Sequence, residues 1–172
     1  MSALKKVAVV TGANKGIGYG IVKGLCERWT EGDVYLTARD ETRGRKAVEE
    51  LKKLGLNPIY HQLDITDEDS LKKIRDHLKE KYGGIDILVN NAAIAYKNDA
   101  TEPFAIQAEQ TTFVNYFSLV STCKILFPIL KSNARVVNLS SSAGHLFKIP
   151  SSDLRKKFAD NNLDEPTLSD LV

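Results

Sequence analysis

Residues 9–18 read Val-Val-Thr-Gly-Ala-Asn-Lys-Gly-Ile-Gly, and this stretch decides the fold. An apolar run at residues 7–10 leads directly into glycines at positions 12, 16 and 18, and an amphipathic run begins at Ile17. This order predicts a strand, a tight turn and a helix, because glycine lets a backbone turn sharply and lets a ligand approach it closely. A helix N-terminus presents free N–H groups and the positive end of a dipole, so the segment is suited to a dinucleotide pyrophosphate.

The spacing of these glycines is Thr-Gly-x-x-x-Gly-x-Gly, which differs from the Gly-x-Gly-x-x-Gly fingerprint of Rossmann folds. A glycine-rich turn is weak evidence by itself, since a turn that only joins a strand to a helix has the same composition. The rest of the chain has to decide between a ligand site and a structural turn.

Length and composition indicate a globular domain. The chain has 172 residues, of which 42% are hydrophobic and 27% are charged, enough to bury a sizeable core. A net charge of +2 is too balanced for nucleic acid or a membrane surface to be the main partner. We expect no apolar run of membrane-spanning length and no signal peptide.

The cysteines and histidines carry little chemistry in this interpretation. Cys26 and Cys123 fall within apolar helical patterns, which predicts buried free thiols in a reducing compartment, and therefore a cytoplasmic location. His61, His77 and His145 lie far apart in the sequence and show no metal-ligand spacing, so no metal site is expected. None of the three is a strong candidate for a general acid, although His145 follows the last predicted strand.

Strand-like apolar runs alternate with helical patterns along the chain. Strands are expected at residues 7–10, 34–36, 59–61, 85–89 and 135–139. The helical stripes between them are Ile17, Ile21, Leu25 and Trp29; Val48, Leu51 and Leu54, with Gly55 as C-cap; Leu71, Ile74, Leu78 and Tyr82, with Thr66 or Asp67 as N-cap; and Phe113, Phe117, Val120 and Leu130, with Pro128 near the helix end. This alternation predicts an α/β fold, a doubly wound parallel sheet of the Rossmann type with strand order 3-2-1-4-5.

The composition changes after Pro150. A short helix is expected at residues 152–159, and Asp164-Glu165-Pro166 has the acid and proline that begin another helix. The chain stops about two turns into that helix. We therefore expect a dinucleotide-binding domain at residues 1–150, followed at 151–172 by a truncated helical segment.

Two cations are predicted to meet at the cofactor. Arg39 directly follows the second strand, and Lys15 lies inside the glycine turn. Both suit the 2′-phosphate of NADP, where charge-assisted hydrogen bonds form. Surface charge is the alternative for Arg39, and Arg43 is as consistent with a solvated helix position as with a third contact. Asp40 leaves an NAD-type site open, because an acid one position later could bind the ribose hydroxyls.

Other polar residues follow the remaining strands. Asp64 could accept the adenine amino group or could simply shape a turn. Asn90 and Asn91 end a buried strand, where amides must be hydrogen-bonded; a structural role suits Asn90, and a cofactor contact suits Asn91. Asn115 lies among aromatic residues and needs a partner unless it faces solvent, and Ser141 could polarise a carbonyl or belong to a polar loop.

As a set, these residues resemble the short-chain dehydrogenase/reductase family in identity, order and spacing. The residues that carry the resemblance are Thr11, Gly12, Gly16, Gly18, Asp64, Asn90, Asn91, Ala92, Asn115 and Ser141, within residues 7–144. Residues 36–40, 60–65 and 90–97, together with the polar tail, look like the NADPH-dependent carbonyl reductases of animals. This resemblance implies that residues 151–172 are the start of a truncated helical insertion and that the fold is incomplete on its C-terminal side.

The resemblance implies roles for individual residues. Ser141 would hydrogen-bond the substrate carbonyl, and Asn115 would support a proton-relay water. NADPH or NADP would be bound by Gly12, Asn14, Lys15, Gly16, Ile17, Gly18, Arg39, Asp64, Ile65 and Asn91. The proton would come from the tyrosine of a Tyr-x-x-x-Lys motif, but no tyrosine follows Tyr116. Residues 19–23 match that motif by letter only, since they lie in the cofactor helix.

The expected function is NADPH-dependent reduction of an aldehyde, ketone or quinone carbonyl, with this chain an incomplete and poorly active form. The alternative is a short isoform that binds NADP(H) without catalysis and acts as a sensor or partner module. A third interpretation is an NAD-linked dehydrogenase. The expected partner is a small carbonyl compound, whose identity the sequence does not give; nor does it give the oligomeric state.

Overall fold

A computed structural model describes residues 5–172 and contains one five-stranded parallel sheet. The strands are β1 (Lys6–Val10), β2 (Gly32–Ala38), β3 (Ile59–Gln62), β4 (Ile85–Asn90) and β5 (Leu130–Asn138). Their order is β3-β2-β1-β4-β5, which confirms the predicted fold class and strand order. The order reverses at β1, which pairs with β2 on one side and β4 on the other, so the carboxyl ends of these three strands meet at one edge.

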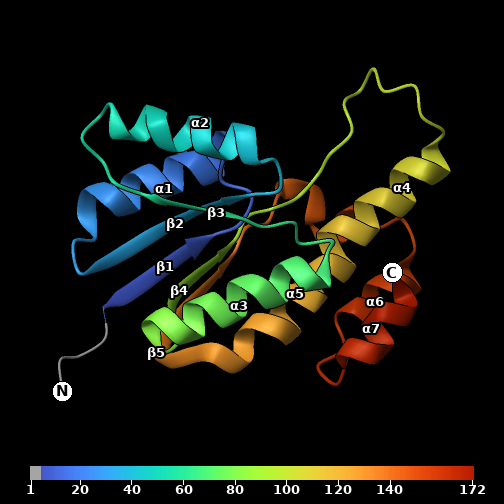
Figure 1. Cartoon of the computed structure of the whole chain (residues 1–172). Coiled ribbons are helices and arrows are strands. Elements are labelled where there is room, and N and C mark those ends of the chain that lie inside the picture. Colours follow the sequence, from blue (N-terminus) through green and yellow to red (C-terminus); the bar gives the residue numbers. More distant parts are fainter. Residues whose placement is uncertain (1–4) are drawn as a thin grey trace. The chain divides into compact units, whose positions relative to one another are not determined.

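Helices cover both faces of this sheet. Helices α1 (Gly16–Arg28) and α2 (Glu41–Lys52) cover one face, while α3 (Glu68–Tyr82) and α5 (Ser118–Leu126) cover the other (Figure 1). The α5 helix ends a longer helical stretch that starts with α4 (Phe104–Thr112) and a π-helical turn, η1 (Phe113–Phe117). A short 3₁₀ turn, η2 (Phe127–Ile129), then leads into β5.

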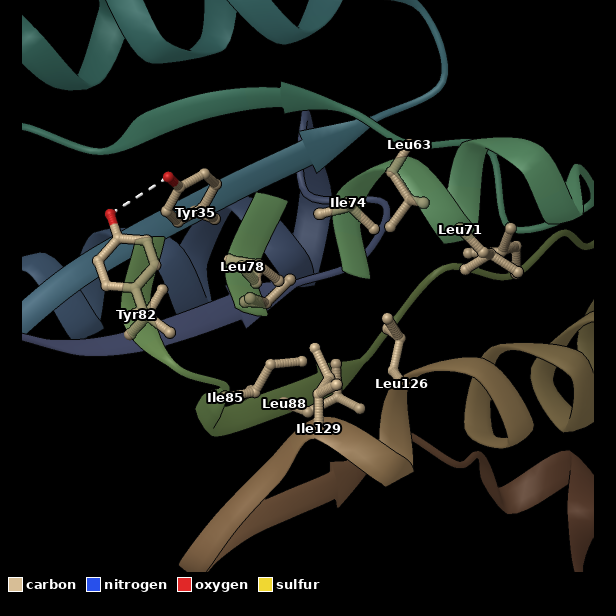
Figure 2. Packing of buried hydrophobic residues seen from close by; sticks show 13 residues of the cluster. Tyr35, Leu63, Leu71, Ile74, Leu78, Tyr82, Ile85, Leu88, Leu126 and Ile129 are labelled. Atoms are coloured by element: carbon tan, nitrogen blue, oxygen red, sulfur yellow. Dashed lines mark hydrogen bonds between the residues drawn. The ribbon is translucent and has the colours of Figure 1, made fainter. Parts of the chain in front are cut away.

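A cluster of buried hydrophobic residues lies between the sheet and helices α3 and α5 (Figure 2). All four residues of the predicted α3 stripe belong to it: Leu71, Ile74, Leu78 and Tyr82. Asp67 caps α3 by accepting a hydrogen bond from the Asp69 N–H at 2.9 Å, which decides between the two predicted caps. Regular helical periodicity therefore predicts this side of the core correctly.

The predicted stripe on α1 is wrong at its first position. Ile17 is 71% exposed, and the residues of α1 that are buried are Gly18 and Val22. Glycine at position 18 allows the start of the helix to lie close to Ala13 in the turn and to the Asn91 side chain. Ile17 is thus an apolar side chain at the rim of the strand ends.

The buried face of the α4–α5 stretch also differs from the prediction. Phe113 and Phe117 are exposed, and α5 instead buries Ser118, Thr122 and Leu126. The two hydroxyls donate to helix carbonyls four or five residues earlier, Ser118 to Phe113 at 3.0 Å and Thr122 to Ser118 at 2.7 Å. With their polar groups satisfied internally, these small side chains can pack in the interior. Leu130, predicted as part of this helix, belongs to β5.

The helical stretch Phe104–Ile129 has 26 residues and a mean hydropathy of 1.3 over its most apolar window, of which 22% is buried. By length and composition it could cross a membrane, so the expectation that no apolar run approaches that length is wrong for this segment. Core helices pass the same test. Leu126 and Ile129 of this stretch belong to the buried cluster beside α3.

Strand β5 begins five residues before the predicted start at Arg135. Its pairing with β4 shifts register between Ile85 and Ile87, and Asn133 has a positive φ of 64°. Asparagine tolerates this conformation better than other non-glycine residues. The irregularity breaks the alternating pattern ahead of Arg135, which is why the sequence reveals only the later part of the strand.

Internal contacts divide the chain into two compact units, Met1–Asn138 and Leu139–Val172. The second unit holds two 3₁₀ turns, η3 (Ser142–Gly144) and η4 (Leu146–Lys148), and helices α6 (Ser152–Phe158) and α7 (Glu165–Leu171). Ser151 and Asp164 cap the two helices through their side chains, and the cap at Asp164 is the one that the sequence predicts. The domain boundary expected at residue 150 stays a prediction, since the contacts divide after Asn138.

Candidate functional site

A cavity of about 400 Å³ lies at the carboxyl ends of the strands in the first unit. It is lined by Gly12, Asn14, Lys15, Gly16, Ile17, Arg39, Asp40, Arg43, Leu63, Asp64, Ile65, Thr66, Asn91, Ala92, Ala93, Ile94 and Val114. Every residue predicted to bind the cofactor is among them except Gly18. The fold therefore brings five separate segments of the sequence to one place, at the edge where the strand order reverses.

The three glycines of the opening motif are needed for two different reasons. A Cβ on Gly12 would lie 2.8 Å from the Cα of Ala92, and one on Gly18 would lie 2.4 Å from the Asn91 side-chain nitrogen. These two positions exclude a side chain for packing reasons. Gly16 has a φ of +59°, and a Cβ there would meet nothing within 4 Å. Gly16 is thus required for its backbone conformation, and it borders open space in the cavity.

The N-terminus of α1 opens into the cavity without a side-chain cap. Lys15 occupies the N-cap position and forms no capping hydrogen bond, and the first turn of α1 contains no acidic residue. By contrast, Asp40 caps α2 and Asp67 caps α3. The free N–H groups and positive dipole end of α1 are therefore available to an anion.

Thr11 fastens the glycine turn to the end of β4. Its hydroxyl oxygen accepts hydrogen bonds from the backbone N–H groups of Asn91 at 3.0 Å and Ala92 at 2.9 Å. The Thr11 backbone N–H donates to the carbonyl of Val89 at 3.0 Å. One buried side chain thus fixes two walls of the cavity relative to each other.

The two asparagines that end β4 both hold neighbouring strands. Asn90 donates to Asn138 on β5 at 2.8 Å, as its predicted structural role requires. The Asn91 amide donates to the carbonyls of Thr11 at 2.8 Å and Gly12 at 2.9 Å. Asn91 therefore holds the glycine turn through its side-chain nitrogen and also lines the cavity. A ligand in the cavity would contact Asn91 through its side-chain oxygen.

The cations at the cavity rim differ in their surroundings. Within residues 5–172, Lys15 and Arg39 take part in no ion pair. Arg43, in contrast, lies 3.4 Å from the Asp40 carboxylate, and the Asp40 side chain also accepts the Arg43 backbone N–H at 2.9 Å. Asp40 is thus occupied as the cap of α2. This arrangement leaves two unneutralised positive charges at the cavity and a partly neutralised carboxylate.

The Asp64 side chain shapes a turn, which is the second of the two roles predicted for it. One carboxylate oxygen accepts from the Thr66 backbone N–H at 3.0 Å and from the Thr66 hydroxyl at 2.7 Å. The Asp64 backbone N–H donates to Ser70 at 3.0 Å. These bonds orient the carboxyl group at the cavity wall, beside the buried side chain of Ile65.

Asn115 lies in the π-helical turn η1, a type of turn that often marks functional sites. Its side-chain oxygen accepts from the Ile94 N–H at 2.8 Å, and its amide donates to the Ile94 carbonyl at 2.9 Å. The partner that a half-buried asparagine needs is therefore the main chain of Ile94, which lines the cavity.

Ser141 belongs to the second unit and is exposed there. Its Oγ accepts a hydrogen bond from the Ala143 N–H at 3.2 Å and so caps the turn η3. Its role toward a substrate stays a prediction.

Some cavity residues were not among the predicted site residues. Ala92, Ala93, Ile94 and Val114 contribute mainly backbone or apolar surface. Apolar residues outside a periodic pattern have no distinctive chemistry, so they are recognised only once the fold places them. Ile94 could be recognised from its position in the sequence, because it follows shortly after Asn90 and Asn91.

The two cysteines are free, as predicted, and half-buried. Burial raises the pKa of both thiols, and the neighbouring Glu27 raises that of Cys26 further. Among residues 5–172, no group of three or more histidine, cysteine or acidic side chains could hold a metal ion.

Residues 6–151 match the family model described as short chain dehydrogenase. This chain belongs to the short chain dehydrogenase family. The match covers the glycine turn, the cavity and the start of the second unit. All the residues that line the cavity therefore lie within the part of the chain that matches the family.

Curated members of the family match the whole chain. Carbonyl reductase [NADPH] 1 of Bos taurus is 50% identical, carbonyl reductase [NADPH] 3 of Mus musculus 49%, and carbonyl reductase [NADPH] 1 of Homo sapiens 48%. In each case the chain spans 62% of the relative's length. This chain is thus shorter than these three carbonyl reductases.

Solved structures share the fold. Salutaridine reductase from Papaver somniferum matches with a TM-score of 0.85 and 32% identity, over 97% of this chain and 68% of that one. Menthone neomenthol reductase from Mentha piperita matches with a TM-score of 0.84 and 31% identity, over 98% and 72%. A short chain dehydrogenase from Burkholderia cenocepacia in complex with NADP matches with a TM-score of 0.67 and 28% identity, over 86% and 58%.

Proposed function

We propose that this chain is the cofactor-binding part of an NADPH-dependent carbonyl reductase, which reduces an aldehyde, ketone or quinone. The observation that carries the proposal is the pair of unneutralised cations, Lys15 and Arg39, at the rim of the cavity. A 2′-phosphate brings two negative charges to a ribose, and it is bound best where cations have no other anion to satisfy. The names of the relatives, carbonyl reductase [NADPH], agree with this cofactor.

The residues present fit a dinucleotide. The uncapped N-terminus of α1 and the open space at Gly16 suit the pyrophosphate. Asp64 and Ile65 suit the adenine side of the cavity, where an oriented carboxylate can accept an amino group. Ile17 offers an exposed apolar surface to the ligand. The alternative acid for an NAD ribose, Asp40, caps α2 instead.

When bound, reduced NADP supplies a hydride to a carbonyl carbon. We propose that Ser141 donates a hydrogen bond to the carbonyl oxygen, where negative charge develops. Asn115 acts as a positioning residue, because it holds the main chain of Ile94 at the cavity. A Tyr-x-x-x-Lys general acid does not occur between Ser141 and Val172. Loss of a positioned general acid costs about 10²–10⁴ in rate, so we expect these 172 residues to bind NADP(H) and to turn over poorly.

The experiment combines binding with turnover on the same preparation. We expect NADP⁺ to raise the melting temperature of the chain, while oxidation of NADPH in the presence of a quinone stays near background. No stabilisation at millimolar NADP⁺ would contradict cofactor binding. Turnover at ordinary enzyme rates by protein of verified mass would contradict the incomplete-form proposal.

A non-catalytic NADP(H)-binding module is the second candidate, favoured by the location of the whole cavity within the unit Met1–Asn138. A fusion separates the two candidates. The chain is joined at its C-terminus to the region of bovine carbonyl reductase 1 that it does not match. Restored quinone reduction supports the reductase proposal, whereas a folded fusion that binds NADPH and stays inactive supports the binding module.

We further propose a cytoplasmic location and a small-molecule carbonyl substrate. The free, protonated thiols support a reducing compartment, and the names of the relatives support the substrate class.

A further inference from the structure

Two histidines that are distant in the sequence meet on the face of the sheet covered by α3. His61 lies on the edge strand β3 and His77 on α3, and their ring centres are 5.3 Å apart with an angle of 40° between the planes. Both side chains are partly exposed. The histidines show no metal-ligand spacing along the sequence, but the fold brings this pair together.

A chain of hydrogen bonds sets which nitrogen of His77 carries the proton. The Tyr82 hydroxyl donates to the Asp33 carboxylate at 2.7 Å, so its only proton is used there. The hydrogen bond between the Tyr35 and Tyr82 hydroxyls, 3.2 Å long and drawn in Figure 2, must then use the proton of Tyr35. The 2.8 Å contact between the Tyr35 hydroxyl and His77 Nε2 therefore requires the proton to be on Nε2.

The same reasoning applies to His61. Its Nδ1 lies 2.6 Å from the carbonyl oxygen of Gln62, which can only accept, so Nδ1 carries the proton. In the neutral rings, the lone pairs are therefore on His61 Nε2 and His77 Nδ1. Within residues 5–172, neither of these two nitrogens has a hydrogen-bond donor.

We propose that His61 Nε2 and His77 Nδ1 together bind one divalent late transition-metal ion of the zinc type, with water completing the coordination. Imidazole is a preferred ligand for such ions. Metal-binding histidines commonly donate their other ring N–H to a carbonyl or another oxygen, which fixes the ring orientation. Both rings show that arrangement, with Tyr35 as the partner of His77 and the Gln62 carbonyl as the partner of His61.

The separation of the rings fits this coordination. Zinc lies about 2.0–2.1 Å from an imidazole nitrogen, so two imidazoles at a tetrahedral angle have ring centres roughly 5 Å apart. The observed separation is 5.3 Å. The spacing of the two rings is therefore the spacing expected of two imidazoles that share one ion.

The surroundings of His77 favour the neutral form of its ring, which metal binding requires. Burial lowers the pKa of His77, and the nearby His61 and Lys81 lower it further, while Glu80 acts in the opposite direction. The Glu80 carboxylate, one helical turn beyond His77, also places a negative charge on the same part of α3.

Metal binding here would tie the edge strand β3 to α3. Any ligand that binds only the folded state raises its stability by mass action. The site is separate from the nucleotide cavity, so this inference does not depend on the proposed function.

Zinc titration of the full chain tests the proposal. At a zinc concentration one hundred times the Kd, we expect the melting temperature to rise by roughly 5 °C. The rise should disappear in both His61→Gln and His77→Gln, and it should persist in His145→Gln, which removes the third histidine of the chain. Magnesium should have no effect, because it prefers oxygen ligands. An equal rise in His61→Gln, or no rise with millimolar zinc, would overturn the site.

Two spectroscopic measurements remain decisive if a variant fails to fold. In ¹⁵N NMR of the unmodified chain, the metal-free rings should carry protons on His61 Nδ1 and His77 Nε2, and zinc should shift the other two nitrogens. Cobalt should give a tetrahedral visible spectrum without the charge-transfer band of thiolate ligands. A thiolate band would assign the metal to Cys26 or Cys123 and would contradict the proposal.

Discussion

Asn115 shows how one side chain can position a segment of the cavity that is distant in the sequence. Its amide pairs with both main-chain groups of Ile94, at 2.8 and 2.9 Å. Thr11 and Asn91 form similar bonds with backbone groups about eighty residues away. At the residue scale, the polar side chains of this site are therefore occupied largely in holding the walls in place.

Replacing Asn115 with alanine should destabilise the chain by about 1–3 kcal/mol, because the N–H and C=O groups of Ile94 lose their partners. Cofactor affinity should fall several-fold as the Ile94 segment loosens. Urea unfolding and NADP⁺ titration measure the two effects. Asn98→Ala, at an exposed position in the neighbouring loop, is the matched control and should change neither quantity. Unchanged stability in the Asn115 variant would contradict the positioning role.

Two glycines of α1 provide a matched pair. A Cβ at Gly18 would lie 2.4 Å from the Asn91 Nδ2 atom and 2.9 Å from the Cα of Ala13, whereas at Gly20 it would meet nothing within 4 Å. Gly18→Ala should therefore cost about 1–3 kcal/mol through overpacking. Gly20→Ala should raise the free energy of unfolding by about 0.5–1 kcal/mol through helix propensity. Equal effects in urea unfolding would refute this assignment of roles.

The sequence predicts which residues surround the cavity better than it predicts what they do. Gly12, Lys15 and Arg39 were identified from turn chemistry and charge, and they line the cavity. The hydrogen bonds that join Asn91 and Thr11 are not predictable from the sequence. The two residues lie about eighty residues apart, and only the folded sheet brings them together. Asp40 illustrates the same limit, since its role as a cap became clear only with the backbone of α2 in place.

At the scale of elements, local chemistry predicts strands and regular helices well. The apolar runs before each turn became the five parallel strands, and the α3 stripe became the core. Two of the failures, in the α4–α5 stretch and in β5, follow from backbone irregularity. The π-helical turn Phe113–Phe117 adds a residue to one turn, which rotates the following helix face, so the 3.6-residue pattern misplaces the buried side. Asn133 similarly interrupts the pattern of β5.

The uncapped N-terminus of α1 gives a prediction at this scale. Lys15 has extended backbone angles that suit an N-cap residue, so Lys15→Ser should supply the missing cap. We expect Lys15→Ser to be more stable than Lys15→Ala by about 1 kcal/mol without cofactor. Both variants should bind NADP⁺ more weakly than the unmodified chain. Thermal unfolding with and without NADP⁺ separates the effects, and equal stability of the two variants would indicate that α1 gains nothing from a cap.

At the scale of the whole molecule, a hydrogen-bonded chain joins the start of β1 to α3. Lys5 and Tyr82 both donate to the Asp33 carboxylate, at 2.6 and 2.7 Å. Burial raises the pKa of Asp33, but these hydrogen bonds and the charges of Lys5 and Lys81 outweigh it and hold that pKa below its ordinary value. The ionised carboxylate therefore links the first strand, β2 and α3.

The sign of the pH dependence follows from the lowered pKa. The stabilisation is present above the unfolded-state pKa, at about pH 4, and is lost as the pH falls through the lower folded-state value. Asp33→Asn should reduce the free energy of unfolding by about 1 kcal/mol at neutral pH and flatten its decline in acid. Urea unfolding at several pH values measures this, with the exposed Asp99→Asn as control. An unchanged acid decline would show that Asp33 contributes little.

The central claim is that Lys15 and Arg39 make this cavity a site for a phosphorylated dinucleotide. Calorimetric titration of the chain with NADP⁺ and NAD⁺ tests it most directly. We expect NADP⁺ to bind at least about tenfold more tightly than NAD⁺, which corresponds to about 1.4 kcal/mol. The advantage should disappear in Arg39→Ala while NAD⁺ affinity stays the same. Tighter binding of NAD⁺, or an unchanged preference in Arg39→Ala, would contradict the account.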